Sequence, residues 1–422
     1  MALTAWWADE LVTQYCGDAL TVLQQIPSAS VHMCVTSPPY WHLRDYQTPG
    51  QIGLEESPER YVETLVQIFA QVFRVLRDDG TCWIVIGDAY AGSWSAQSRA
   101  NGNDLGSTLQ GGSMLRARQI QAHARGQTHM GSVKHTPGLK PKDLIGLPWR
   151  VAFGLQANGW WLRSEIIWEK PSCMPESVRD RPTRSHETIF LLTKNERYFY
   201  DAEGIRERHA EESLMRAKRN RFGGKYQGSD TAEHGALKRG NGFGLEGNAD
   251  LVCSPGGRNK RSVWRINPEP LAEPHFAAYP RKLVEPCILA GTSAHGCCPA
   301  CWAPYRRKVD KIKGTPESFN GSAFTHGKTH DARAHLAAVG TGQRTLETTT
   351  TGWAPTCGCG FETVEPCTVL DPFAGAGTSL IVAAQLGRKS IGIELNQDYC
   401  ALAVARYRRG TQLSLGLEAS NA

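Results

Sequence analysis

The spacing of apolar residues predicts alternating strands and helices in the N-terminal part of the 422-residue chain. The run "SVHMCVTS" is short and apolar, which predicts a buried strand. The segment "SPERYVETLVQIFAQVFRVLR" has the spacing of an amphipathic helix, with Ser57 as its N-cap and Pro58 at its first position. Asp79 and Gly80 then predict a turn into a second buried strand, "TCWIVIGD".

The same alternation returns later in the chain. The segment "KPKDLIGLPWRVAFGLQANGWWLRSEIIWEK" predicts a helix and then a strand, separated at Asn158 and Gly159, and "HETIFLLTK" predicts another strand. The C-terminal "CTVLDPFAGAGTSLIVAAQLGRKSIGIELNQDYCALAVARYRR" predicts a strand, a glycine-rich turn, a helix, a strand and a helix. Strands that alternate with helices favour an α/β fold with a mostly parallel sheet covered on both faces.

Polar segments interrupt this pattern. Residues 91–140 are rich in Gly, Ser, Gln, Arg and His, which predicts a mobile loop inserted into the domain. Residues 201–262 are basic and rich in glycine, a composition that is typical of a solvated loop. A third polar stretch, at about 310–350, is rich in Thr, Gly and His.

Composition and charge narrow the class of protein. Apolar residues make up 41% of the chain, but no run of about 18 of them appears, so a membrane-spanning helix is not expected. The N-terminus has no basic region followed by an apolar run, so a secretory signal is not expected either. The net charge of +6 suits a polyanionic partner, although such a charge is also common without one. Most of the 13 cysteines lie singly in apolar segments, which indicates free thiols in a reducing cytoplasm.

The segment "TVLDPFAGAGTS" has the chemistry of a nucleotide-cofactor turn. Gly375 and Gly377 follow a predicted strand and precede a helix, where glycine lets a ligand approach the backbone closely. Glu394 ends the next predicted strand, and an acid at that place can accept both hydroxyls of a ribose. We therefore expect an adenosine-containing cofactor.

The segment "VTSPPYW" leaves a predicted strand on a rigid turn. Neither Pro38 nor Pro39 has an N–H to donate, so the strand ladder cannot continue through them. Without a second motif, a proline-stiffened loop with aromatic residues in the core would explain this stretch.

Both stretches resemble motifs of one family. "DPFAGAGT" resembles the S-adenosylmethionine-binding motif of amino-group DNA methyltransferases, and "TSPPYW" resembles the catalytic motif of the same enzymes. The catalytic motif comes first, which is the permuted order of the family's beta group. The resemblance covers about 15–90, 140–200 and 270–410 and implies a Rossmann-like, doubly wound, circularly permuted class I methyltransferase fold with inserted loops.

The resemblance implies methyl transfer to an exocyclic amine of a base flipped out of duplex DNA. Such an amine is a poor nucleophile, because its lone pair is delocalised into the ring, so two acceptors must polarise it. Ser37 Oγ and the Pro38 carbonyl are the natural acceptors, and Tyr40 would stack on the base. Trp41 either lines the pocket or packs behind it. The catalytic residues we expect are Ser37, Pro38, Pro39 and Tyr40.

The family pattern also assigns binding residues. Asp18 is either an acid near the cofactor's adenine or a helix N-cap. The expected cofactor-binding residues are Asp18, Phe276, Pro280, Thr292, Asp371, Pro372, Phe373, Gly375, Gly377, Thr378, Ser379, Glu394 and Asn396. The expected DNA-binding residues are Trp41, Arg181, Arg184, His186, Arg216, Lys218, Arg219, Arg221, Arg258, Lys260 and Arg261. For Arg181, Arg184 and His186, ion pairs with Asp180 or Glu187 explain the residues equally well.

A cluster of cysteines indicates a structural zinc. Cys298 and Cys301 have knuckle spacing, Cys357 and Cys359 follow as C-x-C, and four thiolates suit zinc. Cys297 is an alternative to Cys298. The gap between the two halves is long for a zinc ribbon, and reduced surface thiols are the competing explanation.

The predicted organisation follows from these segments. Residues 1–200 form the catalytic half, 201–265 the target-recognition segment, 266–296 a helix region that closes over the cofactor, 297–362 the Cys-rich zinc element, and 363–422 the cofactor-binding half.

The expected function is site-specific DNA methylation. The resemblance leaves two target amines: in the family, a serine such as Ser37 at the start of the motif favours cytosine N4, whereas members with long "TSPPYW" and "KPKDL…PWRVA" segments often methylate adenine N6, which we favour. An RNA methyltransferase and a non-catalytic DNA-binding module are remote alternatives. Carbon-5 cytosine methylation needs a nucleophilic cysteine, and Cys287 and Cys367 both fall in apolar segments that predict core positions. We expect a homodimer in a bacterial or phage-infected cytoplasm, associated with the nucleoid; DNA cleavage would need a separate restriction endonuclease.

Overall fold

The computed structural model describes residues 3–43, 45–46, 48–91, 138–140, 142–209, 211, 257–269, 279–313 and 346–419. Internal contacts divide the chain into two compact units. The first consists of Met1–Asp201, Arg261–Tyr305 and Pro355–Ala422, and the second of Ala202–Lys260 and Arg306–Ala354. Nearly all of the predicted 91–140 loop and most of the 201–262 and 310–350 segments lie outside the described residues, as do Phe276, Arg216, Lys218, Arg219 and Arg221.

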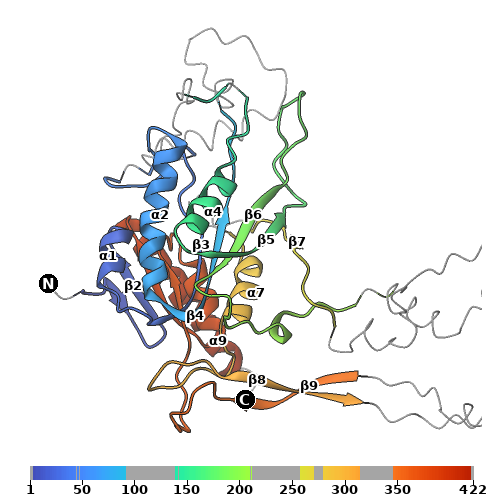
Figure 1. Ribbon diagram of the computed structural model, residues 1–422. Coiled ribbons are helices and arrows are strands. Elements are labelled where there is room, and N and C mark those ends of the chain that lie inside the picture. Colours follow the sequence, from blue (N-terminus) through green and yellow to red (C-terminus); the bar gives the residue numbers. More distant parts are fainter. Residues whose placement is uncertain are drawn as a thin grey trace, which may run out of the picture. The chain divides into compact units, whose positions relative to one another are not determined.

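The first unit is a mixed α/β fold built on a nine-stranded sheet (Figure 1). The strands run in the order β1-β2-β11-β10-β3-β4-β6-β5-β7, and five of the eight neighbouring pairs are parallel, which confirms the predicted mostly parallel sheet. The strands are β1 (Trp7–Ala8), β2 (Val12–Cys16), β3 (Val31–Thr36), β4 (Leu76–Ile86), β5 (Trp161–Glu169), β6 (His186–Thr193), β7 (Val263–Arg265), β10 (Thr368–Asp371) and β11 (Lys389–Glu394).

Helices cover the sheet in two groups. Those of the first unit are α1 (Ala19–Gln25), α2 (Pro58–Val75), α4 (Leu147–Ala157), α7 (Arg281–Gly291), α8 (Thr378–Gln385) and α9 (Gln397–Ala419). Helix α2 packs against α1 and α4, whereas α8 packs against α7 and α9. Each group therefore buries one face of the sheet, as expected of a doubly wound fold. None of the described helices has the length and apolar character needed to cross a bilayer.

Helix α2 illustrates how the sequence specifies an element. The Ser57 hydroxyl accepts the Arg60 amide at 3.3 Å, and Pro58 occupies the first turn, as predicted. Its apolar stripe, which includes Leu65, Phe69 and Val72, is fully buried. Burial of such a stripe contributes roughly 2 kcal/mol for each large side chain.

The predicted turn at Asp79 and Gly80 is wrong. Both residues lie inside β4, which begins directly after α2 at Leu76. The pairing with β3 shifts between Val31 and Met33, so this end of β4 is irregular. Gly80 fits because a Cβ there would lie 3.0 Å from the carbonyl oxygens of both Arg77 and His32.

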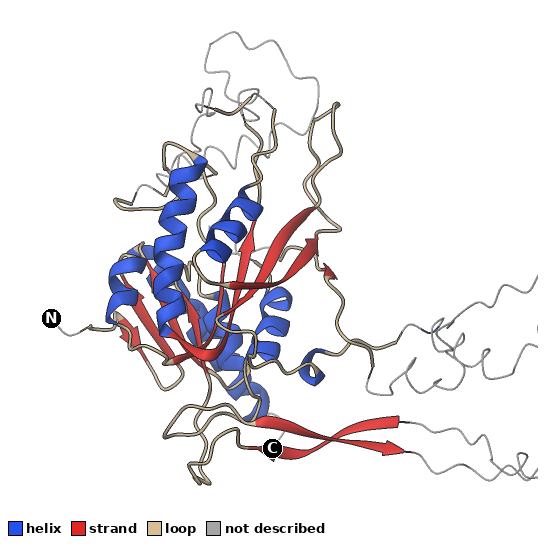
Figure 2. Cartoon of the chain, in the orientation of Figure 1, coloured by secondary structure: helices blue, strands red, loops and turns tan. Residues whose placement is uncertain are grey.

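The second unit contains a short 3-10 helix, η1 (Glu203–Ile205), and an antiparallel two-stranded ribbon of β8 (Arg306–Lys313) and β9 (Leu346–Ala354). Figure 2 shows these two strands as a long, twisted pair. The register of the pairing shifts between Lys308 and Val309. Gly352, opposite Lys308, has a φ of 153°, a backbone conformation that would be strained for a residue with a side chain.

Candidate functional site

The two sequence motifs meet where the strand order reverses. Strands β10 and β3 are parallel neighbours, with Val369 opposite Met33 and Leu370 opposite Cys34. From β10 the chain continues outward to β11, and from β3 it continues to β4 on the other side. Ligands of open α/β sheets bind at the carboxyl ends of strands at such a switch point. The "SPPY" and "DPFAGAG" segments leave β3 and β10 at this place.

A cavity lies between these segments, and the unfilled space in and directly above it, which includes open solvent, is about 1070 Å³. Its lining combines residues that are more than 300 positions apart in the sequence, such as Ser37 and Gly375. Eleven of the predicted site residues line this cavity: Asp18, Ser37, Pro38, Pro39, Tyr40, Pro372, Phe373, Gly375, Thr378, Glu394 and Asn396. The cavity thus brings together the predicted catalytic residues and most of the predicted cofactor residues.

Asp371 connects the two motifs through hydrogen bonds, although it is not part of the cavity lining. Its carboxylate is fully buried and accepts hydrogen bonds from Thr36 Oγ1 at 2.6 Å, from Tyr279 Oη at 2.8 Å and from Ser379 Oγ. The Phe373 amide donates a fourth bond, at 3.1 Å. Burial raises the pKa of this carboxyl, and the three hydroxyl donors oppose that rise. Because Thr36 directly precedes Ser37 and Phe373 belongs to the glycine-rich segment, one carboxylate connects the two motifs.

Glu394 reaches the cavity from the end of β11. One carboxylate oxygen accepts the Gly375 amide at 2.8 Å and the other accepts the Asn396 amide at 2.8 Å. Burial raises the pKa of Glu394 to about 6, although both amides oppose the rise. A carboxylate has about four acceptor positions, and backbone amides do not fill all of them, so Glu394 can still accept from a hydroxyl of a ligand.

Tyr40 is held in place by a charged pair on the neighbouring strands. Its hydroxyl donates to Glu187 Oε2 at 2.8 Å, and Lys170 bonds the other oxygen of the same carboxylate. Burial and the Glu187 charge raise the pKa of Tyr40, so the phenol stays protonated. Gly87 lets the ring pack closely, since a Cβ there would lie 2.7 Å from it. The sequence suggested Glu187 and Asp180 as ion-pair partners of Arg181, Arg184 and His186, but Glu187 bonds Tyr40 and Lys170, and Asp180 bonds Lys142.

The turn itself is fixed from behind. Tyr61 of α2 donates to the Pro39 carbonyl at 2.9 Å. Trp41 is 3% exposed and donates its indole N–H to the Glu55 carbonyl at 2.9 Å, so it packs behind the pocket. The two prolines and these two hydrogen bonds therefore fix the conformation of the turn that carries Ser37 and Tyr40.

Several predicted cofactor residues lie outside the cavity lining. Asp371, Gly377, Ser379, Pro280 and Thr292 are not part of it. Gly377 has a φ of 73°, and a Cβ there would lie 2.8 Å from that of Ala403, so glycine lets α8 and α9 approach closely. Three tyrosines that the sequence did not single out line the cavity instead, namely Tyr46, Tyr279 and Tyr399.

Asp18 is a helix N-cap, and its suggested role near the adenine of the cofactor stays a prediction. It caps α1, accepting the amide and the hydroxyl of Thr21 at 2.8 and 2.7 Å, and it also lines the cavity. Asn396 similarly accepts the Asp398 amide at 2.8 Å at the start of α9.

Most described residues predicted to bind DNA have protein partners. Arg181 bonds Glu176 at 2.6 Å and stacks on Tyr90, and Arg184 lies 3.8 Å from Asp88. In the second unit, Arg258 and Lys260 both pair with Glu207. His186 and Arg261 are exposed.

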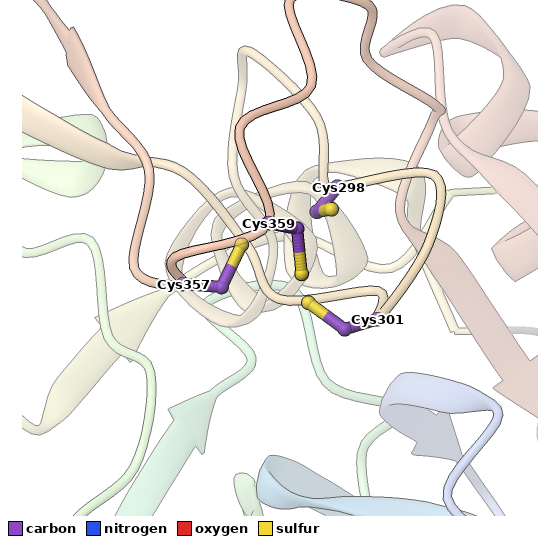
Figure 3. A group of neighbouring side chains, drawn as sticks. All are labelled: Cys298, Cys301, Cys357 and Cys359. Carbon is purple, nitrogen blue, oxygen red and sulfur yellow. The ribbon is translucent and has the colours of Figure 1, made fainter.

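Four of the cysteines converge, as predicted (Figure 3). The sulfurs of Cys298, Cys301, Cys357 and Cys359 all lie within 4.8 Å of one another. Tetrahedral zinc with Zn–S bonds of about 2.3 Å places its sulfurs about 3.8 Å apart, so the four groups fit such an ion. The backbone amides of Cys301 and Ala300 point at Cys298 and lower the pKa of that thiol to about 7.

A second cluster, of His32, Cys297 and Cys367, is buried but does not suit a metal. His32 Nδ1 accepts the Thr368 amide at 3.0 Å, so the proton sits on Nε2, which donates to the Trp302 carbonyl at 2.8 Å. Neither ring nitrogen has a lone pair left for an ion. Cys297 therefore does not replace Cys298, and His32 instead ties the cysteine loop to β3.

The chain is similar to known DNA methyltransferases. Residues 31–298 and 365–405 match the N6_N4_Mtase family model, described as "DNA methylase". The chain is 36% identical to the type II methyltransferase M.Cfr9I of Citrobacter freundii, over 93% of this chain and 87% of that protein. It is 33% identical to the type II methyltransferase M.SmaI of Serratia marcescens, over 93% and 89% of the two chains. The solved PvuII DNA methyltransferase (cytosine-N4-specific) aligns over 97% of this chain and 93% of that chain, with a TM-score of 0.48 and 15% identity.

Proposed function

The chain belongs to the N6/N4 DNA methylase family, and on this premise we propose that it moves a methyl group from S-adenosylmethionine to an exocyclic amine of a flipped base in duplex DNA. The observation that supports this most is the single cavity lined by both motifs at the switch point of the sheet. The family match and the identity to type II methyltransferases support DNA as the substrate.

The residues of the cavity have distinct roles in this proposal. Glu394 accepts the ribose hydroxyls of the cofactor, whose sulfonium supplies an electrophilic methyl group. Ser37 Oγ and the Pro38 carbonyl accept the two hydrogens of the target amine, which turns its lone pair toward the methyl. Tyr40, oriented by Glu187, stacks on the flipped base.

A direct assay tests this function. Tritiated methyl from S-adenosylmethionine is expected to enter duplex DNA when the protein is present, and not RNA of the same sequence. Label in RNA would favour an RNA methyltransferase, and binding of DNA without transfer would favour a non-catalytic module.

The target amine has two candidates. Our sequence-based preference is adenine N6. Ser37 lines the cavity as a neutral acceptor, and a serine at this place in the motif favours cytosine N4. Both amines need two acceptors and a stacking partner, so the same cavity serves either reaction.

The first prediction concerns the pH dependence of cofactor binding. Above pH 6 the buried Glu394 is ionised and accepts ribose hydroxyls; below pH 6 it is protonated and accepts fewer. The Kd for S-adenosylmethionine should therefore rise by up to about tenfold for each pH unit below about 6. Isothermal titration between about pH 7.5 and pH 5 measures this. Glu394→Gln is the matched control, because it should bind S-adenosylmethionine weakly and its Kd should change little across this pH range. A wild-type Kd that does not change with pH would mean that Glu394 does not bind the cofactor.

We further propose that the four converging cysteines hold a structural zinc. The donor set and the spacing of the sulfurs support this, as does the knuckle around Cys298. His32 and Arg77, which donates to the Cys301 carbonyl at 2.7 Å, connect the cysteine loop to β3 and β4. Zinc would thus stabilise the loop that packs against the first residues of the central strands β3 and β4.

The second prediction is the metal content. Atomic absorption should find one zinc per chain, and Cys301→Ser/Cys359→Ser should lose it and unfold at a lower temperature. Cys173→Ser is the control, because Cys173 lies outside the cluster and should change neither quantity. A metal-free wild type would end the proposal.

The remaining expectations stay proposals. Target recognition by residues 201–265, a homodimer, a cytoplasmic location and a separate restriction endonuclease are each consistent with a type II methyltransferase.

A further inference from the structure

We propose that the β8–β9 ribbon is a DNA-binding arm that contacts the phosphate backbone. The proposal rests on the proposed function, since it takes duplex DNA as the substrate. The ribbon lies in residues 299–364, between the two ranges that match the family model. It also lies outside the 201–265 segment in which we expected target recognition.

The charge of the ribbon points to a polyanion. Strand β8, "RRKVDKIK", has five basic residues and one acidic residue among eight. Its partner β9, "LETTTTGWA", adds four threonines and one acidic residue. A strand with this many basic residues is not suited to a hydrophobic core. A two-stranded β-ribbon has a width that the major groove of DNA can accommodate.

The exposed face of the ribbon is available for binding. Arg306 and Lys308 are exposed, and within the described residues neither side chain takes part in a hydrogen bond or an ion pair. The residues opposite them are small, Ala354 and Gly352, so they do not cover this face. In contrast, the predicted DNA contacts of the same unit, Arg258 and Lys260, are paired with Glu207.

The opposite face holds the ribbon in shape. Arg307 lies over the Trp353 ring at 4.5 Å and donates to Thr350 Oγ1 at 3.0 Å. Such cross-strand pairs stabilise an isolated two-stranded ribbon, which is otherwise marginal in water.

Both strands of the ribbon connect along the chain to segments that carry the cysteine cluster. The two halves of that cluster flank the ribbon in the sequence, with Cys301 before β8 and Cys357 after β9. The Thr356 hydroxyl donates to the Pro304 carbonyl at 2.8 Å, which joins the two chain segments beside the cluster. Because these two segments are held together, the chain ends that enter and leave the ribbon are already constrained, which reduces the entropy lost when the arm is ordered on DNA.

The test is the charge-reversal variant Arg306→Glu/Lys308→Glu, compared with Arg197→Glu/Arg409→Glu. The control reverses two exposed arginines of the first unit, so the net charge of the two proteins is the same. The ribbon variant should bind a duplex oligonucleotide about 10- to 100-fold more weakly at about 0.1 M salt, and its log Kd against log salt slope should fall by about 2. The Kd for S-adenosylmethionine and the metal content should match those of the wild type.

The outcomes separate the two proposals. If the wild type neither binds nor methylates DNA, both the proposed function and the arm are wrong. If the wild type methylates DNA but the ribbon variant matches the control in Kd and slope, only the arm is wrong. The milder Arg306→Gln/Lys308→Gln variant should show an intermediate loss of affinity, and an unchanged affinity would also overturn the inference.

Discussion

Replacing Ser37 with alanine should slow methyl transfer by on the order of 100-fold while leaving cofactor binding nearly unchanged. The hydroxyl lines the cavity at the end of β3, and it can accept one hydrogen of the target amine. Its loss leaves the Pro38 carbonyl as the only proposed acceptor. The lone pair of the target nitrogen then stays more delocalised into the ring, and the amine is a weaker nucleophile. Single-turnover methyl transfer measures the rate, and titration with S-adenosylmethionine measures the affinity.

A matched serine controls for the substitution itself. Ser30 lies at the opposite end of the same strand and donates to the Pro27 carbonyl at 2.7 Å. Ser30→Ala should transfer methyl groups at the wild-type rate. If Ser37→Ala does so as well, the hydroxyl is not an acceptor and the carbonyl of Pro38 carries the polarisation alone.

Replacing Asp371 with alanine should reduce the free energy of unfolding by about 3 kcal/mol. Three hydroxyls and one amide donate to this buried carboxylate, and alanine leaves them all without their acceptor. The same change releases Thr36, so turnover should fall together with stability. Urea unfolding and a methyl-transfer assay on the residual folded protein measure the two effects.

Asp371→Asn separates the effect of shape from that of charge, because the amide side chain keeps one acceptor oxygen. This variant should lose less free energy of unfolding than Asp371→Ala. Asp78 is the control, since its side chain is 84% exposed and bonds only at the surface. Asp78→Ala should change stability by less than about 0.5 kcal/mol. An Asp371→Ala protein as stable as this control would mean that the carboxylate does not join the two motifs.

Local patterns predicted most of the elements and both motifs. The Ser57 cap, the buried strand before "SPPY" and the glycine turn before α8 depend on neighbours within a few positions. The convergence of the four cysteines was also predictable, because thiol pairs at such spacing have few other uses. The order of the two motifs then implied that they meet at one edge of the sheet.

Residues whose roles depend on distant partners were not predictable. Asp371 lies at the end of a strand, where an acid often binds a ligand. Donors from β3, α8 and Tyr279 instead make it a buried carboxylate that connects these segments. The bond between Tyr40 and Glu187 crosses 147 positions, so nothing local reveals it. The turn predicted at Asp79 and Gly80 is wrong because both residues lie within β4, in the irregular stretch between Leu76 and Thr81, the two β4 residues that pair with β3 on either side of them.

The most direct test of the central claim is the chemical identity of the methylated base. Duplex DNA methylated by the protein with deuterated S-adenosylmethionine is digested to nucleosides and separated by mass spectrometry. The account predicts a methyl group on an exocyclic nitrogen, as N6-methyladenine or N4-methylcytosine, and the product also decides between these two. A label found as 5-methylcytosine, or no labelled nucleoside at all, would contradict it.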